Sequence, residues 1–233
     1  MQDPDMKHSG IKSNLEHRIF PVILPVPLKE RNLKGRERVT TLSRLARQAL
    51  KVSALKCRFR LGELTKDDHG VPLPFDGHYW SLTHKPKYVG AVISLQKTGI
   101  DIEEVRAISN PMFQRVAGDQ EWRLGGSRSE MLFFRFWTAK EAVLKAEGVG
   151  MTGLSSCVIH RLWDRQHLEI AYQDKIYLIE HVYFNGHIAA VVKNKLHSQW
   201  TIPNINVKRS EEPCNELSLQ MTKSSLPPKS ESA

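Results

Sequence analysis

Asp101 and Glu103 have the residue type and the spacing to bind a hard cation. They alternate with two isoleucines in the segment GIDIE, residues 99–103. Because successive side chains of a strand point to opposite faces, the two carboxylates would share one face. Oxygen ligands at this spacing suit Mg²⁺, which usually takes further oxygens from a substrate phosphate. The pair predicts a magnesium site; the alternative is an exposed acidic strand edge.

A second segment, FWTAKEAVLK at residues 136–145, is an aromatic-rich helix that must bury most of its surface. Glu141 and Lys145 lie one turn apart on the same helical face. In isolation they form an ordinary surface pair worth about 0.3–0.5 kcal/mol. They gain a functional meaning only beside the carboxylate strand and a third segment.

That third segment, Ser81-Leu82-Thr83-His84, ends in a histidine at the end of an expected strand. A lone histidine in such a place is more often capped or solvent-facing than catalytic. His84 is therefore a candidate only in combination with the other two segments.

Hydrophobic periodicity predicts the elements that must position these residues. Strands are expected at residues 19–24, 78–83, 88–94, 99–105, 167–172, 175–184 and 187–192. An arginine-rich helix is expected at residues 37–56, with an apolar stripe of Val39, Leu42, Leu45, Ala46, Ala49 and Leu50. Another helix follows Asn110-Pro111. The clearest helix runs from 129 to 147, ends at Gly148 and buries Leu132, Phe136, Ala139 and Val143. The order of elements favours an α+β fold over a doubly wound parallel sheet.

Composition places the chain among ordinary globular proteins. It has 233 residues, of which 40% are hydrophobic and 25% charged. The apolar stretch at residues 20–27 holds three prolines and falls short of the roughly 20 residues that cross a bilayer. The first ten residues lack a secretory signal, and the three cysteines are too far apart for a disulfide framework or a zinc site. A cytoplasmic location with reduced thiols is expected.

The formal charge of +9 is concentrated in the first third of the chain. Residues 1–66 hold 15 Lys or Arg and 6 Asp or Glu, whereas the remaining residues hold equal numbers of each sign. Such a segment suits nucleic acid, an acidic protein or a multiply phosphorylated small molecule, and it can also be a merely solvated basic face. Residues 201–233, rich in Ser, Pro and Lys, are expected to form a disordered tail.

Taken together, the three segments resemble 4′-phosphopantetheinyl transferases, specifically the larger monomeric class typified by the surfactin-synthetase activating enzyme. That class has a strand of the pattern GIDIE, then a helix of the pattern WTAKEA, with a Ser-His pair upstream. Here these stand at residues 99–103, 137–142 and 83–84, in the same order. The resemblance covers roughly residues 20–195, and the order and spacing of the motifs are more specific than any one of them.

The resemblance implies two pseudo-symmetric α+β halves with the active site in the cleft between them. Residues 1–98 would form the basic N-terminal half on the coenzyme A nucleotide side. Residues 99–200 would form the C-terminal half with the metal and catalytic motifs. A monomer with no membrane or nucleic-acid partner is the corresponding expectation.

The implied activity is transfer of the 4′-phosphopantetheine moiety of coenzyme A to a carrier-protein serine, with release of 3′,5′-ADP. Asp101, Glu103 and Glu141 match the metal-binding carboxylates, and Lys145 matches a lysine that contacts the phosphates. His84 and Thr83 match the coenzyme A-binding Ser-His pair, and Arg38 approximately matches a basic residue near the nucleotide. A serine hydroxyl needs a proton acceptor at neutral pH, for which Glu141 is the candidate base.

At two positions the sequence departs from the residue pattern of this family, so residue functions cannot be assigned there by matching alone. Thr83 replaces the usual serine, and Val71 stands where some relatives carry a nucleotide-binding lysine. Contacts to the 3′-phosphate would then come from other basic residues of the first half, such as Lys29, Arg31 or Lys34. Glu121 resembles a further acidic position of the family and can equally be a surface residue.

Two other functions remain open at this stage. The basic first third alone would suit a nucleic-acid-binding module, although the sequence has no zinc-finger spacing or RNA-recognition signature. The carboxylates would also suit a Mg²⁺-dependent phosphodiesterase or nuclease. Both would bind polynucleotide strongly at low salt, whereas a transferase would consume coenzyme A only with an apo carrier protein.

Overall fold

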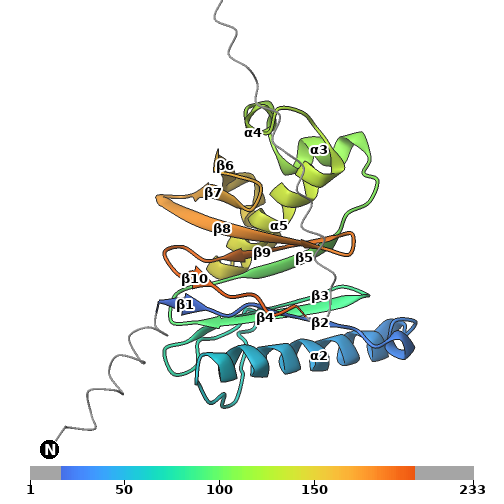
Figure 1. Cartoon of the computed structure of the whole chain (residues 1–233), viewed down its shortest axis with the longest axis vertical. Coiled ribbons are helices and arrows are strands. Elements are labelled where there is room, and N and C mark those ends of the chain that lie inside the picture. The colour runs from blue at the N-terminus through green and yellow to red at the C-terminus, as the bar shows by residue number, and fades with distance from the viewer. Residues whose placement is uncertain (1–16, 203–233) are drawn as a thin grey trace, which may run out of the picture.

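Mainly antiparallel sheets and packed helices form the chain, so the predicted α+β class is confirmed (Figure 1). The computed structural model describes residues 17–202. In chain order the elements are β1 (Arg18–Ile19), β2 (Val22–Pro25), η1 (Leu28–Glu30), α2 (Gly35–Lys56), β3 (Tyr79–His84), β4 (Tyr88–Ser94), β5 (Ile100–Glu104), α3 (Asn110–Val116), α4 (Asp119–Leu124), α5 (Glu130–Glu147), η2 (Gly150–Ser156), β6 (Cys157–Leu162), β7 (His167–Tyr172), β8 (Lys175–Phe184), β9 (His187–Val192) and β10 (His197–Ser198).

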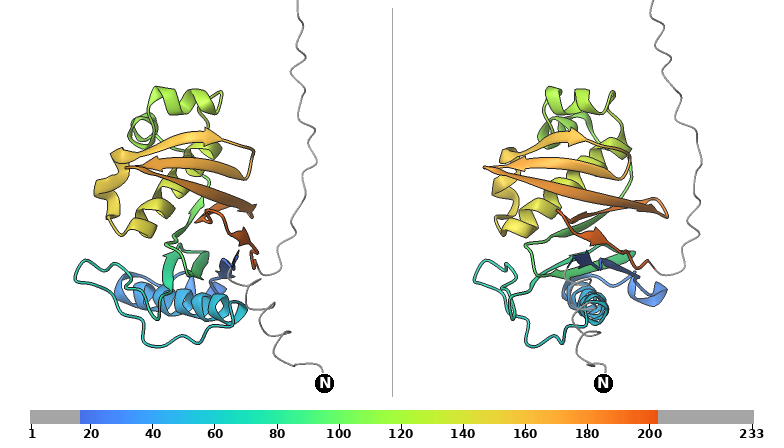
Figure 2. Two further views of the ribbon diagram at one scale, coloured as in Figure 1. Left: turned by 90° about the vertical axis from the view of Figure 1, so that its left-hand side faces the viewer. Right: turned by 60° about the vertical axis from the view of Figure 1, so that its left-hand side comes forward.

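The first sheet has three antiparallel strands in the order β2-β4-β3, and α2 covers its outer face (Figures 1 and 2). The apolar stripe of α2 faces this sheet as predicted for Leu42, Leu45, Ala46, Ala49 and Leu50, which are all buried. The prediction is wrong for Val39, which is 60% exposed. Burial along α2 begins only at Leu42, because the first turns of the helix lie beyond the core.

The second sheet has five antiparallel strands in the order β5-β9-β8-β7-β6. Helix α5 packs against β5 and β9. Ten of the eighteen residues of α5 are buried, as expected for an aromatic-rich helix in a core. Of the predicted stripe, Phe136, Ala139 and Val143 are fully buried, whereas Leu132 is partly buried at the edge of the same core.

Local signals fix both ends of α5. Ser129 is the N-cap residue, and its hydroxyl accepts a hydrogen bond from the backbone N–H of Leu132. Gly148 adopts a left-handed conformation with φ of 72°, and its N–H donates to the carbonyl of Leu144. The predicted end of the helix at Gly148 is confirmed.

Most expected strands are present with small shifts at their ends. The strands at 88–94, 167–172, 175–184 and 187–192 coincide with β4, β7, β8 and β9. The single strand expected at residues 19–24 is wrong, because the chain breaks at Phe20-Pro21 into β1 and β2, which pair with different strands. Proline has no N–H to donate to a continuing strand ladder. The sequence prediction also missed β6 and α4.

The last described residues return to the first sheet. β10 pairs with β1 in parallel, and the carbonyl of Thr201 accepts a hydrogen bond from the N–H of Ile23. Residues 203–233 of the predicted tail lie outside the described residues. The domain limits at 98 and 200, the cytoplasmic location and the monomeric state stay predictions. No helix within residues 17–202 is long and apolar enough to span a membrane.

Gly99, at the start of GIDIE, lets β5 approach α5 closely. A Cβ atom on this residue would lie 1.9 Å from the carbonyl oxygen of Ala142 and 2.9 Å from the backbone nitrogen of Ala146. Both atoms belong to the helix backbone and cannot move aside as a side chain can. Glycine at this position therefore sets the spacing between the carboxylate strand and the motif helix.

We expect Gly99→Ala to lower the free energy of unfolding by at least about 2 kcal/mol, because the added methyl group must push β5 away from α5. Urea denaturation followed by circular dichroism measures the loss. The matched control is Gly118→Ala, where a Cβ would meet only Glu121 Oε2 at an ordinary 3.7 Å. Equal stability of the two variants would contradict the close approach.

Candidate active site

A pocket of about 220 Å³ brings together most of the predicted site residues. One wall comes from the end of β3 and the turn after it, and the other from β5 and α5. Its lining consists of Leu82, Thr83, His84, Lys85, Asp101, Glu103, Trp137, Glu141 and Lys145. Of the predicted site residues, only Arg38 does not line the pocket.

The two carboxylates of β5 are buried, so the alternative of an exposed acidic strand edge is wrong. The exposed fractions of Asp101 and Glu103 are 3% and 9%, because β3 and α5 pack against this strand. Asp101 Oδ1 accepts hydrogen bonds from Thr83 Oγ1 at 2.9 Å and from Lys145 Nζ at 2.7 Å. Asp101 Oδ2 is buried without a hydrogen-bond partner.

Glu103 is held by two donors that the sequence prediction missed. Its Oε1 atom accepts from Lys85 Nζ at 2.6 Å and from Trp137 Nε1 at 3.0 Å. Burial lowers the pKa of Lys85, but the carboxylates of Asp101, Glu103 and Glu141 outweigh it and raise the pKa overall. Lys85 therefore stays charged beside Glu103.

Lys145 and Glu141 do not form the surface pair that their spacing allowed. Lys145 Nζ instead binds Asp101 across the pocket and donates to the carbonyl of Ile100 at 3.1 Å. The carboxylate of Glu141 makes no hydrogen bond or ion pair within residues 17–202. Burial and the nearby charge of Asp101 raise its pKa above the ordinary value, although Lys145 and Lys85 oppose this. A raised pKa makes this carboxylate a stronger proton acceptor.

Positive charges near His84 influence its protonation. Burial is the largest cause that lowers the pKa of His84. The positive charges of Lys145, Lys85, Lys66 and Arg38 lower this pKa further. The imidazole is therefore neutral at pH 7. Arg38, in the first turn of α2, is close enough to act on His84 although it does not line the pocket.

Residues 97–192 match the family profile described as the 4′-phosphopantetheinyl transferase superfamily. This stretch is similar to that superfamily, and it makes up less than half of the chain. It contains β5, α5 and the whole second sheet, with the segments that connect them. Asp101, Glu103, Trp137, Glu141 and Lys145 lie inside the matched stretch, whereas Thr83, His84 and Lys85 precede it. One wall of the pocket is therefore outside the matched stretch.

Two curated proteins carry the same family description in their names. The 4′-phosphopantetheinyl transferase Gsp of Aneurinibacillus migulanus is 32% identical over 91 residues, which cover 37% of this chain and 38% of that protein. The 4′-phosphopantetheinyl transferase Psf-1 of Bacillus pumilus is 32% identical over 83 residues, 34% of this chain and 36% of that protein. The chain spans less than two-fifths of the length of these curated relatives.

The carboxylate oxygens of the pocket suit a divalent cation. Asp101 Oδ2 is a buried acceptor without a partner, and Glu141 lines the same pocket with its carboxylate uncommitted. Such hard oxygen donors fit Mg²⁺. Within residues 17–202, however, no three His, Cys, Asp or Glu side chains form a ready-made metal site. Lys145 and Lys85 each donate to one carboxylate oxygen of β5.

Glu121 does not line the pocket and instead forms contacts within the matched stretch. Its Oε1 atom accepts from Lys140 Nζ at 2.7 Å and from the N–H of Ile159 at 2.8 Å, and its Oε2 accepts from the N–H of Gly118. Lys140 is 2% exposed and also donates to the carbonyl of Val116. Lys140, the lysine of the WTAKEA motif, thus joins α5 to α4 and, through Glu121, to β6. The acidic residue at position 121 therefore has a structural function.

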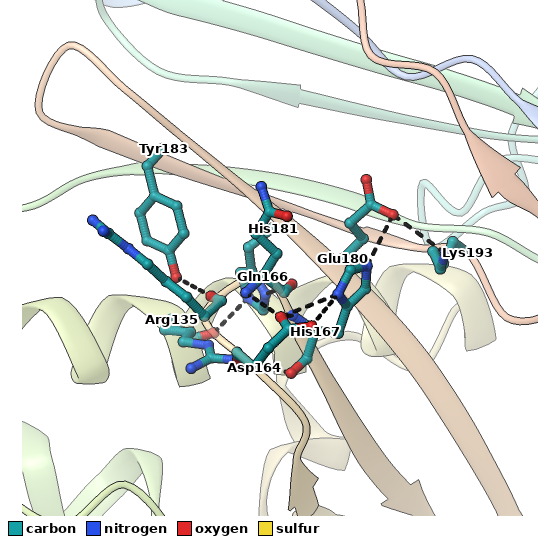
Figure 3. Close-up of polar contacts among 9 residues, drawn as sticks. Arg135, Asp164, Gln166, His167, Glu180, His181, Tyr183 and Lys193 are labelled. Atoms are coloured by element: carbon teal, nitrogen blue, oxygen red, sulfur yellow. Dashed lines mark hydrogen bonds and ion pairs between the residues drawn. The ribbon is translucent and has the colours of Figure 1, made fainter. Parts of the chain in front are cut away.

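A polar network fastens the first half of α5 to the second sheet (Figure 3). Arg135 donates to the carbonyls of Asp164 and His167, the second at 2.9 Å. The ring nitrogens of His181 lie 3.1 Å from the carbonyl oxygens of Gln166 and Arg135. Burial lowers the pKa of His181 to about 3, so its ring is neutral at pH 7. These contacts fix the rotation of α5, which directs Glu141 and Lys145 into the pocket.

Three important polar residues escaped the sequence prediction: Lys85, Trp137 and Lys140. Lys140 and Trp137 stood within the WTAKEA motif, and their polar atoms would need partners if the helix were buried. The need of a buried polar atom for a partner could therefore have indicated that Lys140 and Trp137 make important contacts. Lys85 follows His84 directly, but nothing in the local sequence indicates that its partner is Glu103.

We expect Lys140→Met to lower the free energy of unfolding by about 3–5 kcal/mol, because it leaves Glu121 without its cation at a buried site. Thermal and urea denaturation measure the change. The control, Arg128→Ala, removes an exposed partner of Asp119 on the same helix as Glu121 and should cost about 1 kcal/mol or less. If Lys140→Met stays as stable as Arg128→Ala, the Lys140–Glu121 pair does not hold the domain together.

Proposed function

We propose that this chain transfers the 4′-phosphopantetheine moiety of coenzyme A to a serine hydroxyl of an apo carrier protein, in a Mg²⁺-dependent reaction that releases 3′,5′-ADP. The observation that carries the proposal is the pocket, where the carboxylates of β5 meet Glu141 and Lys145 inside a domain of the transferase superfamily. Carboxylates and fixed ammonium groups side by side suit a phosphate held together with a divalent cation.

Coenzyme A would lie between two pseudo-symmetric halves, residues 1–98 and 99–200. Two observations support this placement. Each of the two larger sheets carries one long helix, α2 on the first and α5 on the second. The pocket also takes its walls from β3 on one side and from β5 and α5 on the other.

In the proposed reaction, the serine oxygen of the carrier protein attacks the β-phosphorus of coenzyme A. A new P–O bond forms to the serine, the bond to the bridging oxygen breaks, and 3′,5′-ADP leaves with the bonding electron pair. Glu141 takes the proton of the hydroxyl, which its raised pKa and lack of a hydrogen-bond partner support. Lys145 faces the phosphoryl oxygens and stabilises their charge.

Asp101, Glu103 and Glu141 are the proposed ligands of Mg²⁺. When bound, Mg²⁺ would neutralise charge on the phosphoryl oxygens and on the leaving group. Asp101 Oδ2 is the strongest of these candidates, because a buried carboxylate oxygen without a partner carries a desolvation cost that a cation would remove. Thr83 and Lys145 hold the other oxygen of Asp101 and so fix the direction of Oδ2.

His84, Thr83 and Arg38 are the proposed contacts to the nucleotide side of coenzyme A. His84 lines the pocket together with Lys85 and Lys145, which supports a site for phosphate. Val71 packs against Gly148 at the end of α5 and offers no charge, so Lys29, Arg31 and Lys34 remain candidates for the 3′-phosphate. The basic first third would also attract an acidic carrier protein and raise the association rate.

We expect the purified chain to consume coenzyme A and modify an apo carrier protein only when both are present with Mg²⁺, with loss of the reaction in EDTA. Mass spectrometry of the carrier protein measures the product. Asp101→Ala should remain folded and inactive. The two other functions make the opposite prediction, since a nuclease or a nucleic-acid-binding module would bind or cleave polynucleotide at low salt without using coenzyme A.

We expect Glu141→Gln and Lys145→Ala to damage different steps. Glu141→Gln keeps the size of the side chain but removes its basicity, so kcat should fall at least ~10²-fold while coenzyme A binding falls less. Lys145→Ala should weaken both binding and the chemical step, with a loss of about 2–4 kcal/mol of transition-state stabilisation. Steady-state kinetics and calorimetric titration of coenzyme A separate the two effects. Near-normal kcat/KM in both variants would remove α5 from the proposed mechanism.

A further inference from the structure

Two lysines enter the pocket from opposite walls and bind the two carboxylates of β5 in the same way. Lys145, on α5, binds one oxygen of Asp101 at 2.7 Å. Lys85, in the turn after β3, binds one oxygen of Glu103 at 2.6 Å. The side chains of Lys145 and Lys85 are about one-third exposed, at 28% and 31%, and both residues line the pocket. Lys145 has a predicted function, but nothing has been assigned to Lys85.

The neighbouring pair Lys87–Glu104 shows that Lys85 is not an ordinary surface residue. Lys87 lies two residues further along the same turn, and its partner is the next residue of the same strand. Both members of that pair are exposed, at 45% and 42%, and neither lines the pocket. The turn after β3 therefore directs one lysine outward and one inward.

The balance of charges in the pocket indicates what Lys85 can bind. Three carboxylates line the pocket, and a phosphate that approached them alone would be repelled. His84 is neutral at pH 7, so the fixed positive charges of the lining are the two ammonium groups of Lys85 and Lys145. An ammonium group has three donors, and Glu103 uses one donor of Lys85. Two donors remain for the oxygens of a ligand.

We propose that Lys85 binds the pyrophosphate group of the substrate and at the same time positions Glu103, together with Trp137. This inference rests on the proposed function for the identity of the substrate. Glu103 Oε1 accepts hydrogen bonds from both Lys85 and Trp137. Because these two donors fix the orientation of the carboxylate, they also fix the direction of its second oxygen, Oε2. Lys85 thus completes the anion site from the β3 wall, as Lys145 does from α5.

The key variant is Lys85→Gln, which keeps a hydrogen-bond donor for Glu103 but removes the charge. We expect the Kd for coenzyme A in MgCl₂ to rise about tenfold or more, the range expected for loss of a hydrogen bond to a charged group. The Kd for inorganic pyrophosphate should rise by a similar factor, whereas the Kd for Mn²⁺ alone should stay equal or fall, because a repelling cation has been removed. Isothermal calorimetry measures all three.

Two further variants separate binding from a structural effect. Lys85→Arg keeps the charge and should restore most of the affinity for pyrophosphate. Lys87→Gln breaks the exposed pair on the same turn and should leave all three dissociation constants unchanged. Thermal denaturation of each variant shows whether the fold is intact. If Lys85 had only a structural function, Lys85→Gln would have a lower melting temperature, and its affinities for pyrophosphate and for Mn²⁺ would change in the same direction.

The outcomes for the wild-type chain keep the two proposals apart. If it binds pyrophosphate through Lys85 but neither binds nor consumes coenzyme A, the proposed function fails and the anion site stands. If it transfers phosphopantetheine normally and Lys85→Gln binds coenzyme A and pyrophosphate as tightly as the wild type, the function stands and the inference about Lys85 is overturned. Failure of the wild-type chain to bind either anion would overturn both.

Discussion

Burial of two like charges on one short strand is the constraint on which the rest of the site depends. Asp101 and Glu103 are almost inaccessible to solvent, and a buried carboxylate is tolerated only with a compensating cation or hydrogen bonds. Each of them has one lysine partner, and those lysines come from different parts of the chain. β3 and α5 must therefore converge on β5, and Gly99 allows the helix to come close enough.

Some polar residues of α5 contact the rest of the fold, and others line the pocket. Lys140 points away from the pocket into a buried pair with Glu121, and Arg135 ties the helix to the loop before β7. Glu141 and Lys145 face the pocket. Because the supporting contacts fix the rotation of α5, the two pocket residues need no contact with each other to be correctly placed.

The superfamily match and the pocket do not have the same extent. The matched stretch, residues 97–192, supplies the carboxylates, and the wall with His84 and Lys85 comes from the sheet before it. The pocket therefore joins the carboxylates of the matched stretch to His84 and Lys85, which precede that stretch.

The sequence alone determined the features that depend on neighbours within a few residues. The α+β class, the limits of β7, β8 and β9, the Ser129 and Gly148 ends of α5 and the shared face of Asp101 and Glu103 all follow from local periodicity and capping. Only the tertiary structure decided the partners. Lys145 binds Asp101 rather than Glu141, and Lys85 and Trp137 bind Glu103, at sequence separations of 18 to 44 residues. Periodicity shows which face of an element a residue occupies, but which charge lies opposite depends on how the elements pack.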